Sequence, residues 1–127
     1  ASVDLAAEEA FHRKHDCIGT VLGVRPQSRF GELVVDGSVV TNFSEKPQLD
    51  GGRPINGGYF MFKREFFDYL SNDEGLVLEQ KPLMDLASAN QLRVFDHSGY
   101  WQCMDTYRDF ELLNRVWDAG DAPWKVW

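Results

Sequence analysis

Residues 17–24, CIGTVLGV, form an apolar run rich in β-branched side chains, and Pro26 follows shortly after it. Continuous apolar runs of this length are typical of inner strands, and proline ends a strand because it has no N–H to donate. On the N-terminal side, Asp4 can cap a helix over residues 5–14. The expected buried face of that helix consists of Leu5, Ala6, Ala10 and Phe11. A helix that leads into a buried strand indicates a layered α/β arrangement.

A hairpin is expected next, over residues 33–43. Its two apolar runs flank Asp36-Gly37, a dipeptide that suits a tight primed turn. Further strands are expected over residues 59–62 and 91–97, separated by helical sequence. Strands and helices therefore alternate along the chain with one hairpin inserted, and this order predicts an α/β fold with a mixed sheet.

Three more helices are expected after the hairpin. Residues 63–70 suit a short one, and residues 78–89 suit a second that tolerates Pro82 only in its first turn. The last begins at Thr106, where Asp109 three residues further on completes a start that resembles a capping box. The inward side chains are expected to be Phe66, Phe67 and Leu70 in the first of these helices and Phe110, Leu113 and Trp117 in the last.

The composition narrows the classes of partner. Lys and Arg total 13 against 20 Asp and Glu, for a formal net charge of -7, and no basic run interrupts this acidity. A nucleic acid is therefore not expected as a partner. No apolar stretch reaches the roughly 20 residues of a membrane span, and no secretory signal opens the sequence. Cys17 and Cys103 lack metal-ligand spacing, which predicts two reduced thiols in a cytoplasmic protein.

Three polar clusters stand at strand ends, where ligands bind in open α/β sheets. The first is Glu45-Lys46-Pro47. Lys46 can meet a phosphate as a point charge, and Glu45 can accept protons from sugar hydroxyls. The alternative is a surface ion pair beside a turn.

The second cluster is Ile55-Asn56-Gly57-Gly58. Adjacent glycines let a backbone approach a ligand closely, and Asn56 offers both a donor and an acceptor to a hydroxylated ring. The alternative is a β-bulge or turn that needs glycine geometry. Arg29 stands in a polar loop, where an arginine taken by itself is typically solvated.

The third cluster is Trp101-Gln102-Cys103-Met104-Asp105-Thr106, in which Asp105 directly precedes the expected helix start. A carboxylate held rigidly there is what a magnesium ion that bridges phosphates requires. The alternative is that Asp105 only caps the helix. His12, His15 and His97 lack nearby partners of catalytic type, and the two on the first helix are expected to face solvent. The sequence has no Ser-His-Asp order, CxxC motif or Walker-type loop.

Together these stretches resemble one family, the glucose-1-phosphate cytidylyltransferases, of the sugar-nucleotide pyrophosphorylase type. The matching segments run in the family's order and cover essentially the whole chain: VDL…FHRKH, RPQSRFGEL, FSEKPQ, INGGYFMF, LEQKPLMDLA, GYWQCMDTYRD and APWKVW. The resemblance implies a partial Rossmann-like, mixed-sheet nucleotide-diphospho-sugar transferase fold. Residues 1–127 would be the C-terminal, sugar-binding portion of a single domain.

The resemblance also implies an activity and a site. The family joins CTP to α-D-glucose 1-phosphate with magnesium, giving CDP-glucose and pyrophosphate, often toward surface polysaccharides. Lys46 would hold the sugar phosphate, and Asp105 would be one of two magnesium ligands; these two would be the catalytic pair, at one rim of the sheet. The substrate-binding residues would be Arg29, Glu45, Lys46, Asn56 and Gly57. Family members assemble, so a homo-oligomer is expected.

The departures from the family pattern are expected to matter. The GxGTR-type loop and the GDG motif are absent, which places this sequence just after the latter and predicts that the chain alone does not make CDP-glucose. Ser2 stands where Asp is common, and Lys81 where Glu is frequent. Two other readings stay open: a uridylyl- or thymidylyltransferase of the same fold, and a non-catalytic sugar-phosphate binding or assembly module.

Overall fold

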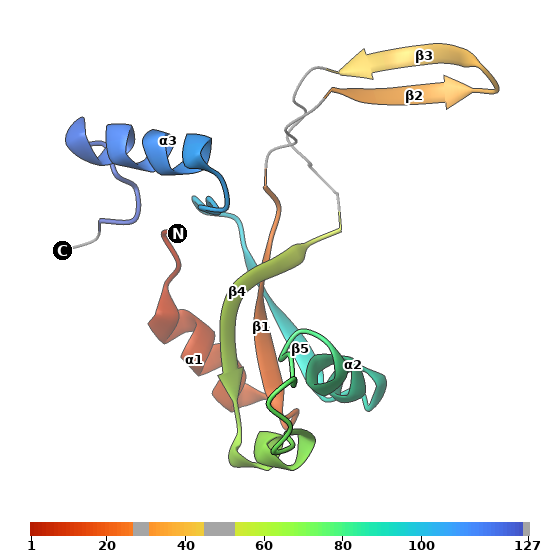
Figure 1. The fold of residues 1–127 in the computed structure, drawn as a ribbon, viewed down its shortest axis with the longest axis vertical. Helices are drawn as coiled ribbons and strands as arrows, with labels where there is room; N and C mark the ends of the chain where they lie inside the picture. The colour runs from red at the N-terminus through yellow and green to blue at the C-terminus, as the bar shows by residue number, and fades with distance from the viewer. Residues whose placement is uncertain (27–30, 45–52, 126–127) are drawn as a thin grey trace. The chain divides into compact units, whose positions relative to one another are not determined.

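The computed structural model describes residues 1–26, 31–44 and 53–125 (Figure 1). The chain divides into two units. One consists of residues 1–2, 24–55 and 98–127, and the other of residues 3–23 and 56–97. No helix among the described residues combines the length and the apolar character that a bilayer crossing requires.

The larger of the two described sheets has three strands in the order β4-β1-β5. These are β4 (Ile55–Phe62), β1 (Gly19–Val24) and β5 (Leu92–His97). The N–H of Lys63, just after β4, donates to the carbonyl of Ile18, just before β1, so these two strands run in opposite directions. The N–H of Gly19 donates to the carbonyl of Gln91, just before β5, so β1 and β5 are parallel. The predicted mixed sheet is confirmed.

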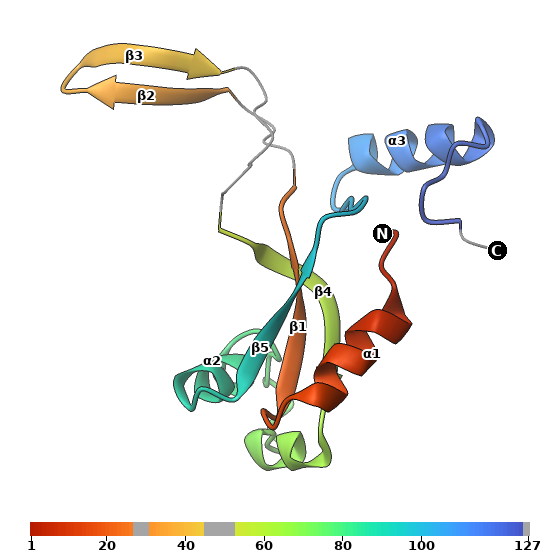
Figure 2. The same ribbon diagram turned by 180° about the vertical axis from the view of Figure 1, so that it is seen from behind.

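Helices cover both faces of β1. Successive side chains of a strand point to opposite sides, so two neighbouring residues of β1 face two different helices. A Cβ built on Gly19 would lie 2.8 Å from Leu86 of α2 (Lys81–Ser88). Thr20, the next residue, hydrogen-bonds to His12 of α1 (Leu5–Lys14). Figures 1 and 2 show the two helices on opposite sides of β1. The predicted layered α/β arrangement is therefore confirmed.

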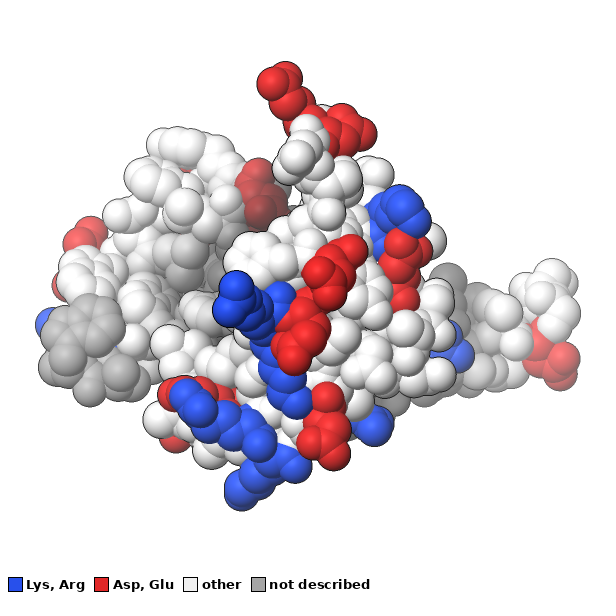
Figure 3. All heavy atoms as spheres, turned by 90° about the horizontal axis from the view of Figure 1, so that it is seen from below, with Lys and Arg blue, Asp and Glu red and all other residues white. Residues whose placement is uncertain are grey.

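The unit that consists of residues 3–23 and 56–97 has a small core, which depends on close contacts around β1. Leu22 and Leu86 are fully buried, and the rings of Phe62 and Phe66 stack at 3.8 Å. Basic and acidic side chains lie next to one another over the face in Figure 3, and the i,i+4 pairs Arg13–Glu9 and Lys81–Asp85 are exposed. Exposed pairs contribute about 0–1 kcal/mol each, so burial of apolar surface is the main stabilising term.

We expect Gly19→Ala to destabilise the fold by about 1–3 kcal/mol, as overpacking of a close-packed core does. The added methyl group would lie 2.8 Å from Leu86 Cδ2, 3.0 Å from Leu92 and 3.2 Å from Phe62. Gly75→Ala is the matched control, because its nearest neighbour would be 3.4 Å away. Urea denaturation measures both variants; equal midpoints would contradict the packing argument.

The short helix after β4 is a 3₁₀-helix, η1 (Arg64–Tyr69). Phe66 is buried and stacks on Phe62 and Tyr69, whereas Phe67 is 71% exposed and Leu70 is also exposed. The prediction that Phe67 and Leu70 turn inward is wrong. A 3₁₀-helix has three residues per turn, so residues three apart share a side and Phe67 lies about a third of a turn away from Phe66.

The expected buried face of α1 is also wrong. Asp4 caps the helix as predicted, with its side chain accepting the N–H of Ala7 at 2.9 Å. The buried residues, however, are Glu8 and His12, while Leu5 is 52% exposed. Glu8 and His12 are four residues apart and therefore share one side of the helix, and this side faces β1.

The predicted hairpin is confirmed as β2 (Glu32–Asp36) and β3 (Val39–Ser44), an antiparallel pair. The strand continues through Asp36, so the two loop residues are Gly37, with φ 58°, and Ser38. A bulge shifts the register between Val34 and Val35. Two of the pairs, Leu33 with Phe43 and Val35 with Val40, consist of apolar side chains only.

The last helix is α3 (Tyr107–Asp118), and its N-cap is Thr106 as predicted. The expected buried stripe is wrong, because Phe110 is 47% and Trp117 45% exposed. Apolar spacing indicates which side of a helix can be buried, but burial also needs a partner surface. The buried residue of α3 is Asp109, at its first turn.

Candidate functional site

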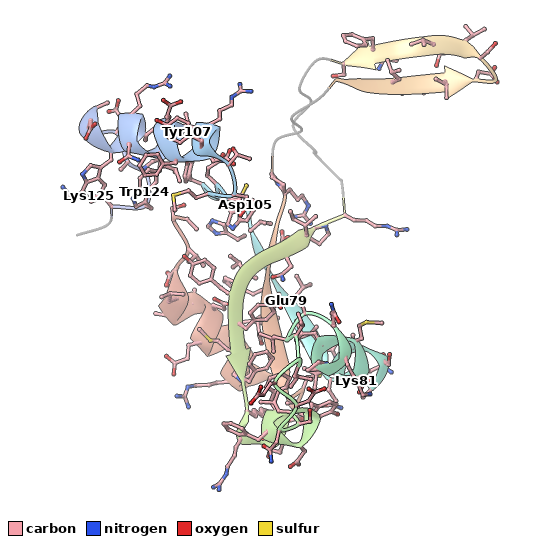
Figure 4. The ribbon with its side chains drawn as sticks, viewed as in Figure 1. Glu79, Lys81, Asp105, Tyr107, Trp124 and Lys125 are labelled. Carbon is pink, nitrogen blue, oxygen red and sulfur yellow. The ribbon has the colours of Figure 1, made fainter. Side chains whose placement is uncertain are left out.

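Asp105 lies in the loop that leads into α3, with Tyr107 on the first turn of the helix (Figure 4). Its side chain is exposed and makes no hydrogen bond or ion pair with another residue in the described ranges. The cap belongs to Thr106, whose hydroxyl oxygen accepts the N–H of Asp109 at 3.2 Å. The alternative in which Asp105 itself caps the helix is therefore excluded, and its carboxylate stays available for a ligand.

The carboxylate of Asp109 completes the capping box and also accepts a hydrogen bond from Gln102. Its Oδ2 accepts the backbone N–H of Thr106 at 3.1 Å and the Thr106 hydroxyl at 2.8 Å. Its Oδ1 accepts Nε2 of Gln102 at 3.1 Å. The T-x-x-D spacing predicted the first of these interactions, but the contact with Gln102 has no sequence signal because it depends on the path of residues 102–105.

The start of β4 carries the second polar cluster. Asn56 Oδ1 accepts the N–H of Gly58 at 2.8 Å, and Gly58 has φ 84°, a conformation that favours glycine. The residues lie inside β4 instead of leading into it, and the glycine geometry is in part structural. Asn56 is exposed, so its amide N–H groups can serve as donors to a hydroxylated ligand, while Gly57 is buried.

The remaining sequence-predicted residues, Arg29, Glu45 and Lys46, lie outside the described residues. Their roles stay predictions, as does the convergence of Lys46 and Asp105 at one rim. Asn56 and Gly57 belong to one unit and Asp105 to the other. The local geometry of each cluster is therefore known within its own unit.

The two residues that depart from the pattern of the family that the sequence resembles, Ser2 and Lys81, both make local contacts. Ser2 donates its backbone N–H to the carbonyl of Tyr100 at 2.8 Å and accepts the N–H of Tyr100 with its hydroxyl at 2.9 Å. Lys81, at the start of α2, pairs with Asp85 at 2.5 Å (Figure 4).

The segment after α3 folds back within the same unit. The Nζ of Lys125 lies 5.2 Å from the centroid of the Trp117 ring, a distance suited to a cation–π interaction. The ring of Trp124 lies 5.5 Å from that of Tyr100 (Figure 4). Burial raises the pKa of the Tyr100 hydroxyl. These contacts give the closing APWK sequence a structural role that spacing did not predict.

The prediction that His12 and His15 face solvent is wrong: His12, in α1, is buried, and His15, the C-cap residue of that helix, is half-buried. His12 is 8% exposed, and its Nδ1 lies 2.8 Å from the hydroxyl oxygen of Thr20. Nε2 of His15 lies 2.8 Å from the same oxygen. A hydroxyl has one proton, so with both rings neutral it donates to one imidazole and accepts from the other. Sequence periodicity missed this cluster because Thr20 belongs to a different element.

The environment of His12 predicts a loss of stability on acidification. Burial first, then the positive charges of His15, Lys63 and Arg13, lower the pKa of His12 below 6.5. Between that lowered value and 6.5 the unfolded chain binds more protons than the folded one. The free energy of unfolding therefore falls as the pH falls through this window, by at most about 1.4 kcal/mol per pH unit.

We expect His12→Asn to flatten this slope, because asparagine can still accept the Thr20 hydroxyl proton but does not titrate. Chemical denaturation of the complete protein at intervals from pH 7.5 to 5 measures the slope. A variant with the same pH dependence as the wild type would show that His12 is not responsible.

A magnesium ion is compatible with Asp105, although the described residues contain no group of three or more His, Cys, Asp or Glu that could hold a metal. Magnesium is usually held by one or two carboxylates together with substrate phosphates and water. One exposed carboxylate that the helix cap does not use fits this mode of binding. It does not fit an ion held entirely by the protein.

Comparison with known proteins assigns the chain to a class. A family model described as nucleotidyl transferase matches residues 2–112. The chain therefore belongs to the nucleotidyl transferase family.

Two individual relatives differ in how similar they are to this chain. The glucose-1-phosphate cytidylyltransferase of Salmonella typhi is 42% identical over 127 residues, which are 100% of this chain and 49% of that protein. A Sulfolobus acidocaldarius protein assigned as a mannose-1-phosphate guanyltransferase is 27% identical over 117 residues, 90% of this chain and 32% of that protein. The chain thus spans about half the length of the cytidylyltransferase. That it is the C-terminal half stays a prediction.

A solved structure supports the fold. A Bacillus anthracis protein assigned as a glucose-1-phosphate thymidylyltransferase, crystallised with sucrose, superposes with a TM-score of 0.58 at 16% identity. The match covers 91% of this chain and 49% of that one. At this identity the likeness concerns the fold alone, and it confirms the predicted sugar nucleotidyltransferase fold.

Proposed function

We propose that the complete protein containing this chain transfers a cytidylyl group from CTP to α-D-glucose 1-phosphate, giving CDP-glucose and pyrophosphate. The observation that carries this proposal is the 42% identity to the Salmonella typhi glucose-1-phosphate cytidylyltransferase over every residue of the chain. The exposed carboxylate of Asp105 and the exposed amide of Asn56 are chemically suited to such substrates.

The reaction is an in-line displacement. A phosphate oxygen of the sugar phosphate forms a bond to the α-phosphorus of the nucleotide, and the bond from that phosphorus to the bridging oxygen of pyrophosphate breaks. No protein nucleophile is required, so the protein acts through positioning and charge. Magnesium, when bound, supplies positive charge to the phosphates.

Each residue has a specific role in this proposal. Asp105 holds the metal through its carboxylate, and Lys46 neutralises the phosphate of the sugar substrate. Asn56 donates to a glucose hydroxyl with its amide nitrogen, since its carbonyl oxygen already accepts the N–H of Gly58. The predicted substrate contacts of Arg29, Glu45 and Gly57 complete the site.

A second candidate function differs from the first in the nucleotide base and in the sugar. The Sulfolobus acidocaldarius relative is assigned as a mannose-1-phosphate guanyltransferase, and its similarity extends over 90% of this chain. A guanylyltransferase that acts on mannose 1-phosphate is therefore the second candidate. It is favoured less because the identity falls from 42% to 27%.

The test is a substrate matrix with the complete protein. CTP, UTP, dTTP and GTP are each incubated with magnesium and either glucose 1-phosphate or mannose 1-phosphate, and pyrophosphate release is measured. We expect the highest kcat/KM for CTP with glucose 1-phosphate. A preference for another pair would replace this proposal with the corresponding transferase, and no release with any pair would favour a non-catalytic binding module.

A further inference from the structure

One buried carboxylate is bonded to the chain on both sides of Asp105. Asp109 Oδ2 accepts the N–H and the hydroxyl of Thr106, the residue directly after Asp105. Asp109 Oδ1 accepts Nε2 of Gln102, three residues before Asp105. The loop that carries Asp105 is therefore attached at both ends to the same group.

The attachment is strong for a loop of this size. Asp109 is 6% exposed, and a carboxylate that accepts several hydrogen bonds forms charge-assisted interactions that are stronger than neutral ones. Gln102 Nε2 also donates to the carbonyl of Cys103 at 3.1 Å, so two acceptors orient the amide. In contrast, the side chain of Asp105 has no partner in the described ranges, and the backbone alone fixes its position.

We infer that Asp109 is the positioning residue for Asp105: it holds residues 102–106 so that the Asp105 carboxylate meets a divalent cation in one fixed place. This inference rests on the proposed function, in which Asp105 binds magnesium. Magnesium demands nearly ideal octahedral geometry, so a ligand that moves loses affinity. Removing a group that orients a metal ligand typically lowers metal affinity about 10–100-fold.

Two variants each break the link between Asp109 and Gln102. In Asp109→Asn the amide has a single acceptor oxygen; if that oxygen keeps the Thr106 cap, the NH₂ group faces the NH₂ of Gln102 and the link to Gln102 breaks. Gln102→Leu removes the same link and leaves the capping box intact. Asp4→Ala is the control for stability, because it removes an equivalent N-cap from α1.

The readout is binding of Mn²⁺ to the complete protein in the presence of pyrophosphate, followed by electron paramagnetic resonance, with the melting temperature measured in parallel. We expect Asp109→Asn to weaken Mn²⁺ binding about 10–100-fold and Gln102→Leu to weaken it in the same direction. Asp4→Ala should lower the melting temperature and leave Mn²⁺ binding unchanged.

Asp105→Asn distinguishes this inference from the function on which it rests. If Asp105→Asn abolishes Mn²⁺ binding while Asp109→Asn and Gln102→Leu bind as tightly as the wild type, the inference is wrong and the proposed function stands. If Asp105→Asn also binds normally, Asp105 is not a metal ligand and both fail. Should Asp109→Asn not fold, Gln102→Leu decides the matter.

Discussion

Asp105→Asn in the complete protein is expected to lower kcat/KM for nucleotidyl transfer by about 100-fold or more, the scale of losing one preorganised charge-stabilising group. Asparagine keeps the shape of the side chain but removes the negative charge that a hard cation prefers. The magnesium concentration that gives half-maximal rate should rise. Steady-state rates of pyrophosphate release over a range of magnesium concentrations measure both effects.

Stability should not change with this substitution. Asp105 is exposed and bonded to no other residue in the part of the chain that the structure describes, and such surface positions usually change stability by less than about 0.5 kcal/mol. Glu111→Gln, which removes one exposed charge from α3, is the matched control and should keep full activity. A rate for Asp105→Asn within about threefold of the control would remove Asp105 from the proposed metal site.

Local signals in the sequence predicted the features that depend on neighbouring residues. Asp4 and Thr106 cap their helices as expected, because a cap needs only a side-chain oxygen and an N–H two or three residues away. The hairpin was predicted for the same reason, although its loop begins one residue later than expected. The order of helices and strands then predicted the mixed α/β sheet.

Features that depend on distant residues were not predictable in this way. The buried side of α1 carries Glu8 and His12 because His12 reaches Thr20 on β1, a contact that helix periodicity does not show. Phe66 and Phe67 were both expected inside, but η1 has three residues per turn, so these two neighbours lie about a third of a turn apart and only Phe66 is buried. The candidate site shows the same division. The capping box was predicted, but the bond between Asp109 and Gln102 was not.

Glu8 is the residue at which we expect a substitution to stabilise the fold most. It is fully buried, and neither carboxylate oxygen has a hydrogen-bond partner in the described part of the chain. Burial raises the pKa of Glu8, and the charge of His97 opposes that rise in part. Burying a charge without partners is unfavourable, and an apolar side chain of similar size is often better tolerated. We therefore expect Glu8→Leu to stabilise the complete protein at neutral pH by about 1–3 kcal/mol.

The pH dependence of the stability gain shows whether the buried charge of Glu8 is its cause. Between 4.5 and its raised value, Glu8 binds more protons in the folded state than in the unfolded one, so its cost to stability grows as the pH rises and is complete above that window. The gain from Glu8→Leu should consequently be largest at neutral pH and shrink on acidification. Glu9→Leu is the matched control, since Glu9 is exposed and paired with Arg13 on the same helix, and it should give little or no gain. Denaturant titrations at several pH values compare the two variants. A gain that does not depend on pH would point to helix propensity or packing, and a loss would mean that the rest of the protein supplies a partner for Glu8.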